Sequence, residues 1–123
     1  MVYKANTKKR EKTDFIAIHC SATANQNFGA ADIDKWHRKQ GWTCIGYHYV
    51  IRRDGTVEQG RDEAVVGAHV ADWNSVSLGI CMVGGVSADD HTKAQNNFTK
   101  AQFESLKKLL VDLKTRYPNA KVQ

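Results

Sequence analysis

Proline and cysteine are both scarce in this sequence. One proline and nine glycines among 123 residues exclude a collagen-like chain or a proline-rich, disordered one. The three cysteines, Cys20, Cys44 and Cys81, are an odd number at irregular spacing, which argues against a disulfide framework and against a paired-cysteine metal site. We therefore expect one domain that folds in a reducing compartment without covalent cross-links.

Long apolar runs are also missing. The N-terminus is basic and lacks the apolar segment of a secretory signal. The longest uncharged stretch, residues 73–88, is too short for a transmembrane helix and contains Asn, Ser and Gly. No membrane-spanning segment is therefore expected.

Positive charge is concentrated at the N-terminus. The formal net charge is +5. Of this, +4 lies in the first twelve residues, from Lys4, Lys8, Lys9, Arg10 and Lys12 against Glu11. We divide the chain into a basic N-terminal arm, residues 1–12, and a domain, residues 13–123. Such an arm is usually solvated, and with Tyr3 as its one aromatic residue it does not predict direct binding to nucleic acid.

Hydrophobic patterning predicts strands mixed with two amphipathic helices. Residues 14–20 and 76–83 read as buried strands, and residues 47–52 and 57–59 as a hairpin. Asp54-Gly55 favours a tight primed turn between the hairpin strands. The first helix is expected over residues 30–40, ending at Gly41.

The second helix is the best-specified element. Thr99 and Gln102 have the spacing of a capping box, and Phe98 and Phe103 that of a hydrophobic staple. An apolar stripe follows, formed by Phe103, Leu106, Leu110, Leu113 and Tyr117. Pro118 ends the helix. The predicted fold is α/β, a mixed central β-sheet flanked by helices.

None of the five histidines has a local metal-binding spacing. His19 lies in an apolar strand, where a hydrogen-bonded core residue is the common case. His37 is expected to pack on its helix, His91 to be solvated, and His69 to border a cleft. The acidic group Glu58, Asp62 and Glu63 is interpreted as a solvated rim of the hairpin. Composition and spacing alone predict no catalytic group.

Several ordered motifs resemble one family. They are Ile18-His19-Cys20-Ser21-Ala22-Thr23, Trp36-His37 with Gln40-Gly41-Trp42, Gly46-Tyr47-His48-Tyr49-Val50-Ile51, Arg53-Asp54-Gly55-Thr56-Val57, Gly60-Arg61, Gly67-Ala68-His69, Ser77-Leu78-Gly79-Ile80 and Val83-Gly84-Gly85. Together they resemble the zinc-dependent N-acetylmuramoyl-L-alanine amidases, which include phage lysozyme-type endolysins and are related to the peptidoglycan recognition proteins. The resemblance covers about residues 11 to 117.

The resemblance implies roles for three residues. His19 matches the first zinc ligand of the family, and Tyr47 matches the catalytic tyrosine near the metal-bound water. His69 is an expected contributor to substrate binding. The implied reaction is hydrolysis of the amide bond between N-acetylmuramic acid and L-alanine in peptidoglycan, by a water that Zn²⁺ activates.

The C-terminus departs from the family pattern. In the family, two further zinc ligands and a catalytic lysine follow the long helix, on the last strand and its loop. This sequence reaches Lys121-Val122-Gln123, where that strand should begin. We therefore expect the domain to lack its C-terminal strand and loop, the Zn²⁺ site to be incomplete and this chain to have little activity.

The resemblance leaves a second class of function open. The alternative is a non-catalytic binding module, either an inhibitor of phage RNA polymerase or a peptidoglycan binder, and the basic arm favours the polymerase version. Phage amidases of this type imply a location in the host cytoplasm, with action on the cell wall after membrane disruption.

Overall fold

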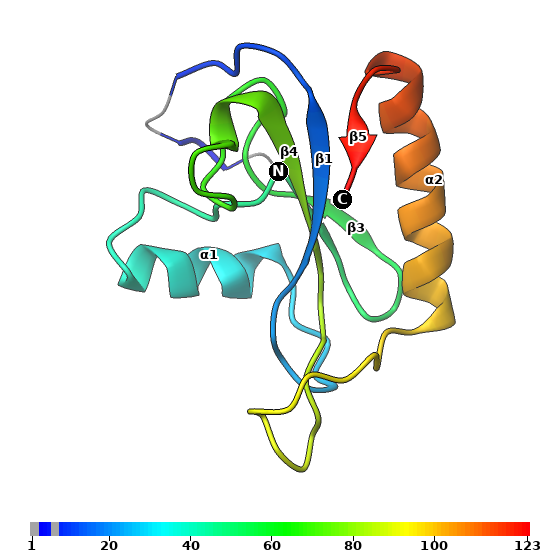
Figure 1. Cartoon of the computed structure of the whole chain (residues 1–123). Coiled ribbons are helices and arrows are strands. Elements are labelled where there is room, and N and C mark those ends of the chain that lie inside the picture. Colours follow the sequence, from blue (N-terminus) through cyan, green and yellow to red (C-terminus); the bar gives the residue numbers. More distant parts are fainter. Residues whose placement is uncertain (1–2, 6–7) are drawn as a thin grey trace.

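The computed structural model describes residues 3–5 and 8–123, and its centre is a five-stranded mixed sheet (Figure 1). The strand order is β3-β2-β4-β1-β5. In chain order the elements are β1 (Phe15–Cys20), α1 (Ala30–Lys39), β2 (Tyr49–Ile51), β3 (Val57–Gln59), the 3₁₀ helix η1 (Asn74–Val76), β4 (Ser77–Met82), α2 (Lys100–Arg116) and β5 (Lys121–Val122). The predicted class, a mixed sheet flanked by helices, is confirmed.

β4 lies at the centre of the sheet, and all six of its residues are buried. It pairs in parallel with β1 on one side and with β2 on the other, while β3 is antiparallel to β2. A strand covered on both faces needs a continuous apolar run rather than an alternating one. This explains why residues 76–83 read as a buried strand.

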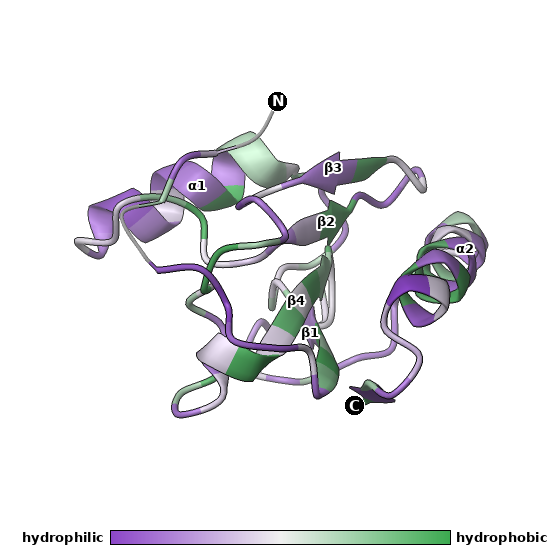
Figure 2. Cartoon of the chain, turned by 90° about the horizontal axis from the view of Figure 1, so that it is seen from above, coloured by the Kyte–Doolittle hydropathy of each residue, from purple (hydrophilic) through white to green (hydrophobic). Residues whose placement is uncertain are grey.

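The two helices cover opposite faces of the sheet (Figure 2). On the α2 face, Leu109 and Leu113 pack with strand residues such as Ile16 and Ile80. On the α1 face, Ala30 and Ile33 pack with residues that include Val50 and Cys81. Each face therefore has its own hydrophobic core, and alternate residues of the strands point into one core or the other.

The predicted start of α2 is confirmed. The Thr99 hydroxyl accepts from the Gln102 backbone N–H at 3.1 Å, and the Gln102 side chain accepts from the Thr99 N–H at 2.9 Å. The rings of Phe98 and Phe103 meet edge to face at 6.1 Å. The stripe is covered unevenly, because Leu113 is fully buried whereas Phe103 remains 47% exposed.

The hairpin is confirmed, but the predicted primed turn is wrong. Gly55 has a φ of +90°, and its N–H donates to the Arg52 carbonyl at 2.9 Å. Asp54 is absent from the described non-glycine residues with positive φ. A type I′ turn needs positive φ at both central residues. The geometry is instead that of a type I turn followed by a left-handed glycine, which closes the hairpin equally well.

The sheet begins a fifth strand at the C-terminus. Lys121 and Val122 pair in parallel with Phe15 and Ile16, and the Ile18 N–H donates to the Gln123 carbonyl at 2.8 Å. β5 thus lies along the first half of β1, as Figure 1 shows. The chain therefore reaches the first residues of the strand that we expected to be missing.

We interpreted the N-terminal arm as solvated. For the backbone of its described residues this interpretation is wrong, because it is hydrogen-bonded to the rest of the domain. The Tyr3 N–H donates to the Gly60 carbonyl at 2.9 Å, and the Arg10 N–H to the Ala64 carbonyl at 2.7 Å. The Val66 N–H donates in turn to the Lys8 carbonyl at 2.8 Å. Tyr3, Lys8 and Arg10 therefore lie along the segment that follows the hairpin, while the Glu11 N–H donates to the Ser75 carbonyl in η1 at 3.0 Å. Within the described part of the chain, no helix has the length and apolar character needed to cross a membrane.

Candidate functional site

The side chains of His19, Tyr47 and His69 come together beside β1 and β4. His19 is near the carboxyl end of β1, on the face that α1 covers. Its ring centroid lies 5.4 Å from that of Tyr47 and 5.0 Å from that of His69. Tyr47 was predicted to lie in a strand, but it precedes β2 by two residues and is in a loop.

His69 contacts His19 directly. His19 Nε2 and His69 Nδ1 are 2.9 Å apart, which is a hydrogen bond between the two imidazoles. The loop that carries His69 is held by Asn74, whose side-chain oxygen accepts from the backbone N–H groups of His69 and Val70, both at 2.9 Å. The role of His69 in substrate binding stays a prediction, because this contact is with a neighbouring side chain.

The imidazoles of this site are neutral at neutral pH. Burial lowers the pKa of His19 from its ordinary value. Burial, together with the neighbouring His48 and His19 rings, lowers the pKa of His69 to about 3. A charged imidazolium would be disfavoured in these surroundings. Each ring therefore has one nitrogen that carries hydrogen and one that carries a lone pair.

Tyr47 is a neutral phenol. Burial raises its pKa well above the ordinary value, and the thiols of Cys81 and Cys20 act in the same direction. Burial also raises the pKa of Cys81, to about 12, so this thiol stays protonated. Tyr47 can therefore take part in hydrogen bonds near His19 but not act as a base.

Two further histidines lie next to the site and have structural roles. His37 Nδ1 accepts from the Gly46 N–H at 2.9 Å, and its ring centroid is 5.6 Å from that of Tyr47. His48 is fully buried, and its Nδ1 accepts from the Gly79 N–H at 3.0 Å. The expected packing role of His37 thus includes holding the loop before Tyr47. His91 is exposed, as expected.

The described residues do not offer Zn²⁺ a set of three ligands. A catalytic zinc ion normally has three protein ligands. Across residues 3–5 and 8–123, no three His, Cys, Asp or Glu side chains are grouped to hold a metal ion. The His19 imidazole is neutral and fits as a single ligand. The donor set of the described residues therefore does not fit a complete catalytic zinc centre.

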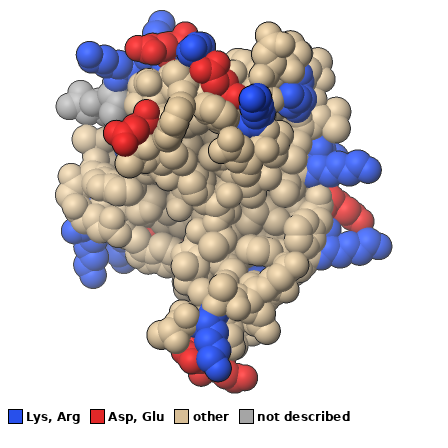
Figure 3. Space-filling model, viewed as in Figure 1, with Lys and Arg blue, Asp and Glu red and all other residues tan. Residues whose placement is uncertain are grey.

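A largely apolar groove begins at His19. It encloses about 480 Å³ between the edge of β1 and α2, and Ile18, Phe98, Phe103 and Leu106 line it. Figure 3 shows that charged side chains surround a broad uncharged surface in the middle of this view, over β1 and its flanks. The groove lies beside the second half of β1. It begins where the pairing of β1 with the C-terminal segment stops, at the bond from the Ile18 N–H to the Gln123 carbonyl.

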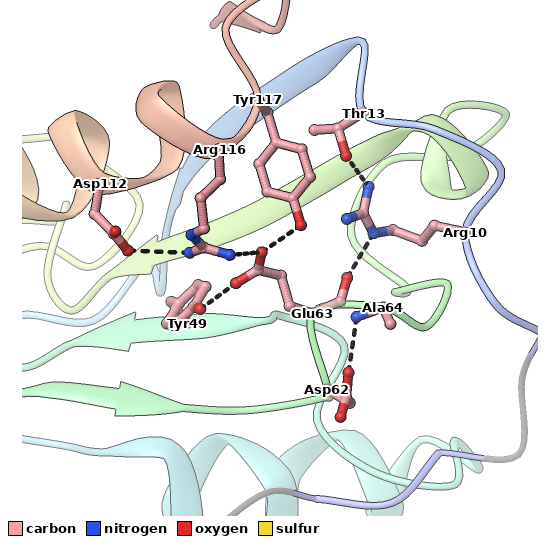
Figure 4. A network of polar contacts seen from close by, with 9 residues as sticks. All are labelled: Arg10, Thr13, Tyr49, Asp62, Glu63, Ala64, Asp112, Arg116 and Tyr117. Atoms are coloured by element: carbon pink, nitrogen blue, oxygen red, sulfur yellow. Dashed lines mark hydrogen bonds and ion pairs between the residues drawn. The ribbon is translucent and has the colours of Figure 1, made fainter.

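The interpretation of Glu63 as a solvated carboxylate is wrong. Its side chain is only 14% exposed and accepts hydrogen bonds from the hydroxyls of Tyr49 and Tyr117, both at 2.5 Å (Figure 4). Arg116 forms an ion pair with the same carboxylate. The Glu63 carbonyl accepts from Arg10 Nε at 2.7 Å. Glu63 is therefore the centre of a cluster that joins the N-terminal arm to the end of α2.

Glu58 also has a structural role. One of its carboxylate oxygens accepts from the Ala30 N–H at 2.9 Å, at the first turn of α1. A carboxylate is stabilised at a helix N-terminus by the free N–H groups and the helix dipole. Among the three acidic residues interpreted as a solvated rim, Asp62 is the exposed one.

Comparison with known proteins identifies the family. A family profile described as N-acetylmuramoyl-L-alanine amidase matches residues 9–123. The endolysin of Escherichia phage T7 is 53% identical over 114 residues, which cover 92% of this chain and 74% of that protein. The endolysin of Klebsiella phage KP32 is 50% identical over 118 residues, covering 95% of this chain and 77% of its own length. The chain belongs to the N-acetylmuramoyl-L-alanine amidase family.

Solved structures agree with this assignment. The endolysin amidase LysCS from Clostridium intestinale URNW has a TM-score of 0.78 at 29% identity, covering 99% of this chain and 80% of that one. Drosophila PGRP-LB has a TM-score of 0.79 at 23% identity, covering 96% and 72%, and shows the shared fold. The chain is thus a peptidoglycan amidase by family, of the phage endolysin type.

Proposed function

We propose that this chain acts on the amide bond between N-acetylmuramic acid and L-alanine of peptidoglycan, with His19 as a zinc ligand and Tyr47 as a catalytic residue. The observation that supports these roles is the approach of the two rings to 5.4 Å at the carboxyl end of β1. When bound, Zn²⁺ would lower the pKa of a water and polarise the substrate carbonyl.

The residues of the chain have definable tasks in this proposal. His19 presents a neutral imidazole, the form that binds a metal ion. Tyr47 stays protonated, so its hydroxyl can donate to a substrate oxygen on which negative charge develops. The His69 ring contacts His19, and we propose that His69 contributes to substrate binding beside it.

Zinc binding tests the role of His19. We expect the purified 123-residue chain to bind Zn²⁺ weakly in calorimetric titration, because no three ligands are grouped among the described residues. His19→Ala should lose this binding, whereas His91→Ala, at an exposed histidine, should keep it. Equal affinities of His19→Ala and the unchanged chain would contradict the proposal.

Product analysis tests the reaction. With purified peptidoglycan and excess Zn²⁺, an amidase releases new amino groups of L-alanine, whereas a glycosidase releases reducing sugar ends. We expect slow release of amino groups, abolished in His19→Ala and strongly reduced in Tyr47→Phe. Reducing ends in place of amino groups would overturn the assignment. We propose that the protein is made in the host cytoplasm and reaches the wall after membrane disruption.

One observation favours the alternative, a binding module directed at phage RNA polymerase. The backbone of the arm is packed, but the side chains of Lys4, Lys8, Lys9 and Lys12 are exposed. They could contact an acidic protein surface. If this function operates, the chain should lower transcription by the phage polymerase at moderate salt, and replacing the four lysines with glutamine should remove the effect. Unchanged transcription with the full chain would dismiss this alternative.

A further inference from the structure

A row of lysines runs along the outer flank of α2. Lys100, Lys107 and Lys114 are seven residues apart, which is close to two helical turns, so their side chains lie nearly in line over about 21 Å of the helix. Lys114 Nζ donates to the carbonyls of Pro118 and Ala120 at 3.0 and 2.5 Å, which holds the ammonium group at the end of the row. Among the described elements, α2 is the outermost on its side of the sheet, so this flank is open to solvent (Figure 1).

Apolar side chains border the lysine row on both sides. Helical spacing puts Phe103, Leu106 and Leu110 on one side of the row and Val111 on the other. Val111 is 62% exposed and Phe103 is 47% exposed. These four side chains and two of the lysines enclose an open hollow of about 360 Å³, which shares Phe103 and Leu106 with the groove beside β1. A continuous exposed apolar surface of this kind usually marks an interaction site.

The positive charge of this flank is not neutralised within α2. The helix has five basic and two acidic residues, so its formal net charge is +3. Asp112 is paired with Arg116 at 3.0 Å. The contact of Glu104 with Lys100 is looser, at 3.9 Å between two exposed side chains. Lys107 forms no ion pair with any residue among 3–5 and 8–123. An unpaired cation bordered by apolar side chains is complementary to a partner that carries negative charge above an apolar layer.

We infer that this flank of α2 binds the surface of an anionic phospholipid bilayer, with the lysine row at the phosphate groups and Phe103 and Val111 inserted between the lipids. Interfacial helices combine basic and apolar side chains in this way, and a lysine stem can lie in an apolar layer while its ammonium group stays at the phosphates. The two helices cover opposite faces of the sheet, so the α1 side, with His19 and Tyr47, would face away from the bilayer (Figure 2). The inference is independent of the proposed roles of these two residues.

A bilayer fits this flank better than a protein partner does. Pairing of two copies through α2 would bring the two Lys107 side chains together, and like charges at an interface are costly. A partner helix packs along a single line, with its axis about 8–10 Å away, and would cover the apolar side chains on one side of the row. A bilayer covers Phe103 and Val111 at once and supplies negative charge along the whole row.

Vesicle binding tests the inference with the unchanged 123-residue chain. We expect co-sedimentation with vesicles of phosphatidylethanolamine and phosphatidylglycerol, weakening as salt is raised, and little binding to phosphatidylcholine vesicles. Each lysine near an anionic surface contributes about a fivefold gain in affinity, so Lys100→Gln combined with Lys107→Gln should weaken binding about 25-fold. No binding to the anionic vesicles at physiological salt would overturn the inference, also if the chain then binds an acidic helical peptide.

A matched pair of charges on the N-terminal arm separates this site from general attraction by net charge. Lys8 and Lys9 are exposed on the arm. Lys8→Gln combined with Lys9→Gln removes the same charge as the α2 pair and should weaken binding by no more than about twofold. Equal losses for the two double variants would show attraction without a site and would refute the inference. All four substitutions are at exposed positions, and circular dichroism checks the fold of each variant.

Insertion of the apolar side chains is tested separately. In a Cys20→Ser background, which leaves the buried Cys44 and Cys81, an environment-sensitive fluorophore is attached at Val111→Cys or, as a control, at Ala31→Cys, an exposed position of α1. We expect a blue shift of the emission with anionic vesicles at position 111 and none at position 31. A probe at position 111 that stays in water while the protein is bound, or equal shifts at both positions, would rule out this mode of binding.

Discussion

The side-chain amide of Gln102 donates to the backbone carbonyl of Val83 at 2.9 Å, beneath the first turn of α2. The same amide donates to the Ile51 carbonyl at 3.1 Å, while its oxygen accepts from the Thr99 N–H. Gln102 is fully buried and each of its polar atoms has a partner. One side chain thus caps α2 and fixes it to the ends of β2 and β4.

Replacing Gln102 with leucine should therefore destabilise the fold. The substitution keeps the bulk of the side chain but leaves the Thr99 N–H without its capping partner. We expect a loss of about 2 kcal/mol in the free energy of unfolding, measured by urea denaturation. Lys108→Ala, at an exposed position of the same helix, should change it little. Equal stability of the two variants would show that the buried amide contributes no net stability.

Glu63 should make the stability depend on pH in the acid range. Burial raises its pKa, but the hydrogen bonds from Arg116, Tyr117 and Tyr49 outweigh burial and hold the pKa below its ordinary value. The stabilisation is therefore present above the ordinary glutamate pKa and is lost as pH falls through the lower pKa of the folded state.

Glu63→Gln tests this contribution. We expect the variant to be about 1–2 kcal/mol less stable than the unchanged chain at pH 7, and the difference to shrink as the pH is lowered towards 3. Thermal unfolding across this range measures both effects. Glu104→Gln removes a carboxylate whose side chain is 62% exposed and should have little effect at any pH. A difference for Glu63→Gln that is independent of pH would contradict the expectation.

Deleting residues 1–12 should weaken the domain. The deletion removes the backbone bonds of the arm to Gly60 and Ala64 and the contact of Arg10 with Glu63. Since each net hydrogen bond contributes about 1 kcal/mol, we expect a loss of at least about 2 kcal/mol. The matched control replaces Lys4, Lys8, Lys9 and Lys12 with glutamine, which removes charge but keeps the backbone. If both variants unfold at the same urea concentration as the unchanged chain, residues 13–123 form the domain without the arm.

Gly79→Ala should destabilise the fold through His69. The new methyl group would lie 2.6 Å from the His69 Cγ, so the ring or the strand must move. We expect a cost of about 2 kcal/mol. In the His69→Ala background the same change should cost almost nothing, because the clash is gone. A double-mutant cycle measures the difference, and an equal cost in both backgrounds would refute the contact.

Features that depend on neighbouring residues could be predicted from the sequence. The capping box of Thr99 and Gln102 spans three residues, and the hairpin depends on Asp54-Gly55. The type of turn could not be predicted, because Asp-Gly is compatible with several turns and the pairing of β2 with β3 selects among them. The hydrogen bond from the Gln102 side chain to the Ile51 carbonyl could not be predicted either, since Ile51 is 51 residues away along the chain.

The site was predicted only in part for the same reason. His19 and Tyr47 are found through motifs, which locate residues but not their neighbours. His69 and His19 are 50 residues apart along the chain. Glu63 was misinterpreted because Arg116 and Tyr117, its partners, follow more than 50 residues later.

The Glu63 cluster also has a consequence for how the molecule opens. Its bonds reach Arg10 near one end of the chain and Tyr117 near the other, so neither terminal segment can separate without disturbing the same carboxylate or carbonyl. The arm, the segment after the hairpin and the last turn of α2 should then open as one cooperative unit in native-state hydrogen exchange, with similar protection, rather than fray independently as chain ends usually do.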